Sequence, residues 1–179
     1  AFDVARVAAW LRENAADARG LAGIPSVGQF GGGASNLTYL LRYAASPTFP
    51  SGRDLVLRRP PVGTKAKGAH DMRREHDLQA ALAPAFPLVP RMVAYCQDEA
   101  ILGSDFYVME RVEGVILRRD IPPELGLSAD ATRRLCVTAI DTLADLHAVD
   151  VDAAGLSALG RGPGYVARQV GGWSERYRR

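Results

Sequence analysis

The sequence contains few cysteines and no long apolar run. Cys96 and Cys136 are forty residues apart and lack the spacing of a metal site, so we expect free thiols and neither a disulfide framework nor a zinc centre. No apolar run reaches the roughly 18–20 residues that span a bilayer. The first residues, "AFDVARVAAWLRENAADARG", lack the layout of a signal peptide. We therefore expect a cytoplasmic protein with no membrane partner.

An excess of one charge is also missing. The 22 basic and 20 acidic residues give a formal net charge of +2, which is too balanced to indicate nucleic acid as the main partner. The 179 residues suffice for one domain, or for a small lobe with part of a second. Nothing in the sequence predicts the oligomeric state.

Apolar periodicity predicts a chain in which one helix precedes a β-β-β-α-β-β order and further helices follow. The predicted helices cover 3–14, 70–82, 128–147 and 163–177, and the predicted strands cover 27–30, 37–43, 55–59, 92–96 and 106–112. The character of the chain changes near residues 112–114. We therefore expect a mixed lobe over 1–112 and the start of a helical lobe over 113–179.

Three consecutive glycines, Gly31, Gly32 and Gly33, stand in the stretch "QFGGGASNLTYLL". The residues after them alternate with period 2 and therefore predict a strand, whereas a dinucleotide-binding fold needs a helix there. Ser35 does not stand in a G-x-S-x-G elbow. A glycine-rich hairpin turn without a ligand remains open. The other reading is a strand–glycine loop–strand that covers nucleotide phosphates with backbone N–H groups, as in kinases.

A phosphate-binding loop of this kind requires a cation on the next strand and an acid on the following helix. Arg58 shares a strand face with Val56 and can bind phosphate oxygens, although kinases carry a lysine in this place. Glu75 is the best-placed acid for an ion pair with Arg58, and Asp71 and Asp77 could take its place.

A third requirement is an apolar strand that leads into a linker able to bind adenine. The stretch "FYVMERVEG" fits, because Met109 would border the pocket. The linker Glu110, Arg111 and Val112 would then offer a backbone carbonyl and an N–H group. The order of these features predicts a nucleotide site.

Seven stretches, spread from about Val27 to Tyr177, resemble the aminoglycoside phosphotransferase-like kinases. The nearest branch contains the kinase-like domains of acyl-CoA dehydrogenase family members ten and eleven. The stretches are "FGGGASNLTYLL", "LVLRRPPVG", "AHDMRREHDLQAAL", "VPRMVAYCQD", "GSDFYVMERVEG", "DTLADLHAVD" and "YVARQVGGWSERY".

The resemblance implies an α+β, protein-kinase-like fold. An antiparallel five-stranded N-lobe sheet with one main helix would precede the first helices of an α-helical C-lobe. It also implies ATP and Mg²⁺ as cofactors and a small-molecule hydroxyl as the substrate, with hydroxyacyl-CoA-like compounds implied for this branch. On this resemblance, Gly31–Asn36 would cover the phosphates and Ser35 would donate to one of them. Arg58 would replace the lysine and pair with Glu75, and Glu110–Val112 would form the hinge.

The catalytic motif of these kinases, His-Gly-Asp followed by an asparagine, is absent from the 179 residues. We expect the catalytic base and the Mg²⁺ ligands beyond Arg179, so this part alone would be inactive although the full-length protein would be a phosphotransferase. Two other hypotheses stay open: a non-catalytic nucleotide- or acyl-CoA-binding module, and a glycine-rich scaffold with no ligand.

Overall fold

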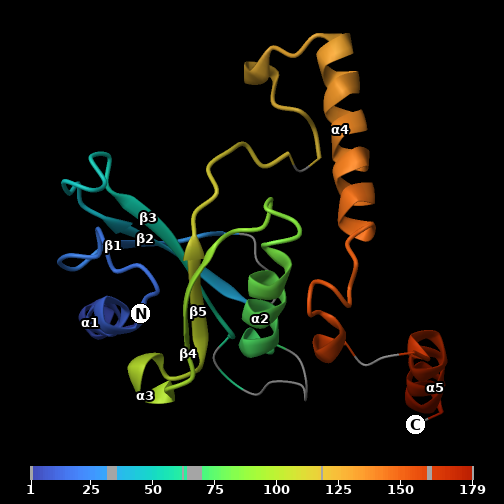
Figure 1. The fold of residues 1–179 in the computed structure, drawn as a ribbon, viewed down its shortest axis with the longest axis horizontal. Helices are drawn as coiled ribbons and strands as arrows, with labels where there is room; N and C mark the ends of the chain where they lie inside the picture. Colours follow the sequence, from blue (N-terminus) through green and yellow to red (C-terminus); the bar gives the residue numbers. More distant parts are fainter. Residues whose placement is uncertain are drawn as a thin grey trace.

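A five-stranded antiparallel sheet forms the centre of the fold (Figure 1). The computed structural model describes residues 2–31, 36–61, 63, 70–117, 119–160 and 163–178. The strands are β1 (Ser26–Gln29), β2 (Leu37–Tyr43), β3 (Arg53–Arg59), β4 (Met92–Cys96) and β5 (Phe106–Glu110). Their spatial order is β1-β2-β3-β5-β4. This sheet confirms the predicted α+β class.

In the described ranges, five α-helices accompany the sheet, and four of them are at the predicted places. They are α1 (Val4–Asn14), α2 (Met72–Leu82), α3 (Glu99–Leu102), α4 (Ala129–His147) and α5 (Tyr165–Tyr177), with short 3₁₀ helices at Pro123–Leu125 and Ser157–Leu159. α3 is not among the predicted helices, because four residues are too few to show a helical period. It also placed the end of β5 two residues too late.

The hydrophobic core lies between α1 and one face of the sheet. Val7 and Leu11 of α1 are fully buried together with Leu41, Leu55 and Leu57 of the strands. The guanidinium of Arg6 ties α1 to α3, since its Nη1 donates to the carbonyl of residue 100 at 2.9 Å. Burial of this apolar face is the main source of stability of the sheet.

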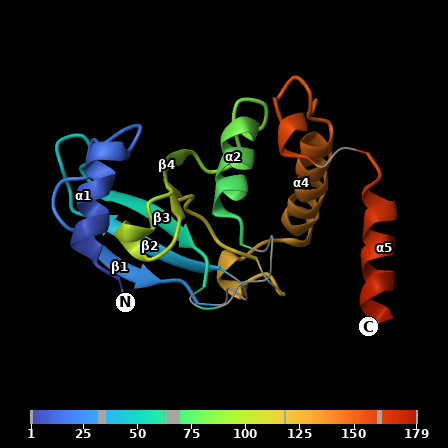
Figure 2. The ribbon, with the colours of Figure 1, turned by 90° about the horizontal axis from the view of Figure 1, so that it is seen from below.

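The opposite face of the sheet is turned toward α2. Figure 2 shows the sheet between α1 and α2, with α4 and α5 farther out on the α2 side. No described residue of α4 or α5 is buried. The apolar side chains on these two helices, such as Ile140 and Trp173, are 66% and 63% exposed. The predicted boundary after Val112 stays a prediction.

Candidate functional site

Arg58 and Glu75 form the ion pair that the sequence predicted. Strand alternation puts Arg58 of β3 on the face toward α2. The carboxylate of Asp71 accepts from the backbone N–H of Arg74 and caps α2, which places Glu75 in the first turn. Arg58 Nε donates to Glu75 Oε2 at 3.0 Å, and both side chains are one-third exposed. Of the two alternative acids, Asp71 serves as the cap and Asp77 pairs with Arg73.

Two further side chains donate to the same carboxylate. Asn36 Nδ2 donates to Glu75 Oε1 at 2.9 Å, and the hydroxyl of Tyr107 donates to Glu75 Oε2 at 3.2 Å. Tyr107 is directly opposite Arg58 in the pairing of β3 with β5. Glu75 therefore has donors from the end of the glycine segment, from β3 and from β5, which together define its orientation.

An outer layer of contacts supports these donors. Asn36 is 7% exposed, and its Oδ1 lies 2.5 Å from His70 Nδ1. His70 has a φ of +62°, a conformation uncommon for a non-glycine residue. Gln79 Nε2 donates to the hydroxyl of Tyr107 at 3.4 Å and to the carbonyl of Glu75. Because Asn36 is bonded to both Glu75 and His70, its side chain holds α2 rather than reaching into open space.

Burial controls the protonation of Tyr107. It raises the pKa of this hydroxyl to about 12, although the hydrogen bond from Gln79 acts in the opposite direction. Tyr107 therefore remains protonated at neutral pH and can donate to Glu75.

The predicted hinge, Glu110–Val112, begins at the last residue of β5. Met109 is opposite Val56 of β3, on the same face as Arg58. The carboxylate of Glu110 accepts from Arg53 Nη2 at 2.6 Å and from Arg91 Nη2 at 2.7 Å, so this side chain fixes the end of the strand.

Two of the three linker residues already use their backbone N–H groups in hydrogen bonds within the fold. The N–H groups of Glu110 and Arg111 donate to the carbonyls of Arg91 and Asp54. Val112 is 69% exposed. A ligand that needs a backbone donor in this linker would therefore approach Val112.

The glycine segment connects two antiparallel strands. β1 pairs with β2, and the N–H of Phe30 extends the ladder with a bond to the carbonyl of Thr38 at 2.9 Å. Gly31 is exposed. Gly32, Gly33 and Ser35 lie outside the described residues. The strand that follows confirms the strand–glycine segment–strand prediction over the dinucleotide fold.

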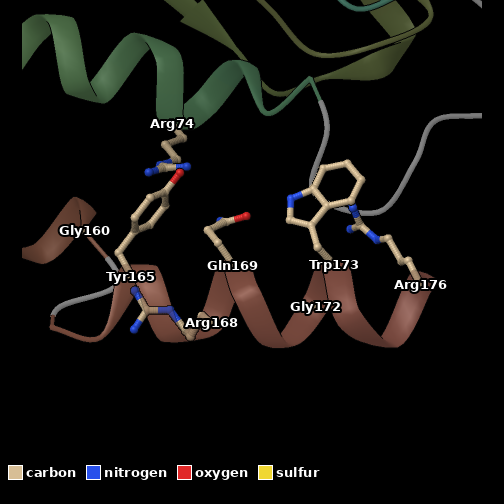
Figure 3. Close-up of a pocket in the computed structure, with 8 residues that line it drawn as sticks. All are labelled: Arg74, Gly160, Tyr165, Arg168, Gln169, Gly172, Trp173 and Arg176. Carbon is tan, nitrogen blue, oxygen red and sulfur yellow. The ribbon is translucent and has the colours of Figure 1, made fainter. Parts of the chain in front are cut away.

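Two of the cavities beside α2 share the side chain of Arg74. One of about 500 Å³ lies between Arg74 of α2 and α5 (Figure 3). The other, of about 320 Å³, is lined by Glu75 together with His70, Asp71, Arg74 and Leu78. Glu75, a predicted site residue, thus also borders a cavity beside α2.

Sequence reasoning missed Tyr107, Gln79 and His70. Gln79 could have been found, since it stands four residues after Glu75 on one face of a helix. Tyr107 could not, because its place beside Arg58 depends on the pairing of β3 with β5, which the sequence does not specify. His70 reaches Asn36 through an unusual backbone angle that no sequence pattern indicated.

The described residues contain neither a candidate metal cluster nor a candidate membrane-spanning helix. No described group of three or more His, Cys, Asp or Glu side chains could hold a metal ion. Within the described ranges, no helix is both long enough and apolar enough to span a bilayer.

Comparison with known proteins points to one family. The model of the family described as APH, phosphotransferase enzyme family, matches residues 26–179. Acyl-CoA dehydrogenase family member 11 of Gallus gallus is 41% identical over 156 residues, which are 87% of this chain and 19% of that protein. Acyl-CoA dehydrogenase family member 10 of Mus musculus is 36% identical over 165 residues, or 89% of this chain and 15% of that protein. The chain thus spans about a fifth or less of these relatives.

A solved structure has the same fold. It is the crystal structure of a Ralstonia eutropha JMP134 protein whose description assigns it provisionally to the aminoglycoside phosphotransferases. The two structures superpose with a TM-score of 0.74 at 32% sequence identity. The match covers 99% of this chain and 48% of that one. The kinase-like fold that the resemblance implied is therefore confirmed.

Proposed function

Because the chain belongs to the phosphotransferase enzyme family, we propose that it supplies the nucleotide-binding part of an ATP-dependent kinase that acts on a hydroxyl of a small molecule. The nucleotide would lie on the sheet face that carries Arg58 and Met109. Catalysis in such enzymes consists mainly of positioning and charge stabilisation around the phosphates.

The ion pair between Arg58 and Glu75 is the observation that carries this proposal. The Nε–H group of Arg58 donates to Glu75 and so fixes the plane of the guanidinium, and the two Nη groups would bind phosphate oxygens. Asn36 holds Glu75 from the end of the glycine segment, so the segment and the cation are linked through one carboxylate. This linkage favours a phosphate site over a glycine-rich turn without a ligand.

Adenine would bind at the other end of the same face. Val56 and Met109 are side by side there, in the pairing of β3 with β5, and the linker begins one residue after Met109. The N–H of Val112 would serve as the donor to the base, since those of Glu110 and Arg111 are already bonded. Backbone groups of Gly31, Gly32, Gly33, Ser35 and Asn36 would cover the phosphates.

The acceptor and the metal complete the proposal. Mg²⁺ would neutralise charge on the phosphates, and its protein ligands are expected beyond Arg179. The names of the relatives support a CoA-linked acceptor, a hydroxyacyl-CoA-like alcohol.

Calorimetric titration with ATP and Mg²⁺ tests the nucleotide site. Arg58→Met should weaken binding about tenfold or more, because a charge-assisted hydrogen bond is worth about 1.5–3 kcal/mol. Arg19→Met is the matched control: Arg19 pairs with Asp17 at 2.7 Å, and its carbonyl accepts from Arg53 on the α1 side of the sheet. Equal affinity of both variants and the wild type would remove Arg58 from the site.

A second candidate is a module that binds nucleotide or acyl-CoA without phosphoryl transfer. The arginine in place of the kinase lysine favours it, since the two cations differ in reach and geometry. Incubation of the full-length protein with ATP, Mg²⁺ and a hydroxyacyl-CoA separates the two candidates. Phosphorylated acceptor supports the kinase, whereas tight ATP binding without product supports the module.

A further inference from the structure

The cavity between α2 and α5 is built from one face of α5 and a single side chain of α2. Tyr165, Gln169 and Trp173 follow each other at intervals of four residues, which puts them on one side of the helix. Figure 3 shows all three pointing toward α2, with Arg74 extended from α2 toward Tyr165. The space enclosed is about 500 Å³, which suits a small molecule.

The described lining of this cavity contains three arginines and no carboxylate. They are Arg74, Arg168 and Arg176. Arg168 Nη1 donates to the carbonyl of Pro163 at 2.5 Å, which orients its side chain along the start of α5. Arg74 and Arg176 lie at the two ends of this space and attract an anion, because the guanidinium fork matches phosphate and carboxylate oxygens.

An aromatic ring lies next to these charges. Trp173 is 63% exposed, and the guanidinium of Arg176 lies 4.9 Å from its ring centroid. A guanidinium above an indole keeps its edge N–H groups available, because they point outward in the plane of the guanidinium. An exposed indole at the wall of a cavity offers a flat apolar surface to a second ring.

We propose that this cavity binds a phosphate ester that carries a flat ring. Arg176 holds the phosphate beside Trp173, Trp173 stacks on the ring, and Arg74 adds positive charge from the α2 side. The site shares no lining residue with the nucleotide face described above, so it is a second phosphate-binding site rather than an extension of the first. It does not depend on the proposed kinase activity.

The two tryptophans of the chain provide a direct test. Trp10 packs edge-on against Phe106, with ring centroids 5.3 Å apart, whereas Trp173 lines the cavity. In ¹⁵N-labelled protein each indole N–H gives one NMR signal, and a Trp10→Phe variant assigns them. Phenyl phosphate is the probe, and inorganic phosphate and phenol each supply half of its chemistry.

Phenyl phosphate should shift the Trp173 signal in a saturable way and leave the Trp10 signal in place. It should bind more tightly than phosphate or phenol alone. Arg176→Ala should weaken binding about tenfold, and Arg74→Ala, which acts over a longer distance, should weaken it less. The matched control is Arg73→Ala, on the same helix, because Arg73 pairs with Asp77 instead of lining the cavity. This control should bind phenyl phosphate as the wild type does.

The proposal is overturned if phenyl phosphate leaves the Trp173 signal unchanged, or if phenol binds equally well. Wild-type affinity in both arginine variants also overturns it. Arg58→Met separates this site from the nucleotide face: it should lose ATP and keep phenyl phosphate. Loss of phenyl phosphate in Arg58→Met would mean that there is one site and not two.

Discussion

The two faces of the sheet differ although the same strands form them. On β3, Leu55 and Leu57 are completely buried against the α1 side, whereas Arg58 on the α2 side is one-third exposed and paired with Glu75. One face therefore contributes apolar burial, and the other contributes oriented charge. The candidate site therefore lies on the α2 face, whereas the apolar packing that stabilises the sheet lies on the α1 face.

The largest expected effect is on stability, at the buried face. Leu57→Ala should lower the free energy of unfolding by about 2–5 kcal/mol, because it removes buried methyl groups and leaves a cavity. Val56→Ala, the neighbour on the other face, should cost less, since it removes fewer atoms at a position that is 7% exposed. Urea denaturation of both variants measures the difference. Equal losses would contradict the division between the faces.

The next effect is on nucleotide binding, at the α2 face. Glu75→Gln should weaken ATP binding about tenfold, because the neutral amide holds Arg58 less firmly than the carboxylate does. Asp77→Asn on the same helix removes a carboxylate paired with Arg73 and serves as the control. Calorimetric titration gives both affinities. If the control loses as much affinity as Glu75→Gln, the loss follows from removing any negative charge on α2 and not from the contact with Arg58.

Tyr107→Phe should have a smaller effect, about 1 kcal/mol in the free energy of unfolding, through loss of its hydrogen bond to Glu75. It should also change the alkaline titration. Because the folded pKa of Tyr107 is raised to about 12, its contribution to stability is present below pH 10 and is lost as the pH rises toward 12.

Tyrosinate absorbance measures this titration. The wild type should show one more tyrosine ionising near pH 12 than Tyr107→Phe does. If the variant instead loses a tyrosine that titrates near pH 10, Tyr107 is not buried as described.

The smallest effect concerns Asp54, at the far end of the α2 face. Burial raises the pKa of Asp54, but hydrogen bonds from Arg42 and Arg111 outweigh it, so the pKa is lowered from 3.8. The stability that Asp54 contributes is therefore present above pH 3.8 and is lost as the pH falls below that value. Asp54→Asn should flatten the acid limb of a plot of stability against pH. An unchanged acid limb would mean that these ion pairs contribute nothing.

The sequence predicted the elements with strong periodicity and one side-chain pair. The sequence pattern located all five strands to within two residues at each end. The face shared by Val56 and Arg58 led to Glu75, the best placed of the three acids on the next helix. Tyr107 escaped, since strand pairing brings together residues that are far apart in the sequence. The short helix α3 escaped as well, since Asp98 and Gly103 cap only one turn. Contacts that depend on strand register, and helices of a single turn, are not predicted by sequence periodicity.

The burial of charged side chains could not be predicted from the sequence either. Arg53 lies outside the predicted strand 55–59 and Arg59 is its last residue, yet they are only 2% and 8% exposed. Arg53 is satisfied by Glu110 and by two backbone carbonyls, and Arg59 Nη1 donates to the carbonyl of Leu102. Buried arginines of this kind resemble surface residues in a sequence, because only their partners distinguish them.

Hydrogen–deuterium exchange with and without ATP and Mg²⁺ tests the central claim most directly. The account predicts slower exchange where the nucleotide would lie, in the segments 31–40, 56–59 and 110–113. It predicts unchanged exchange in α1 and α3, which cover the opposite face. Protection confined to α5, or to the α1 side of the sheet, would contradict a nucleotide site on the α2 face.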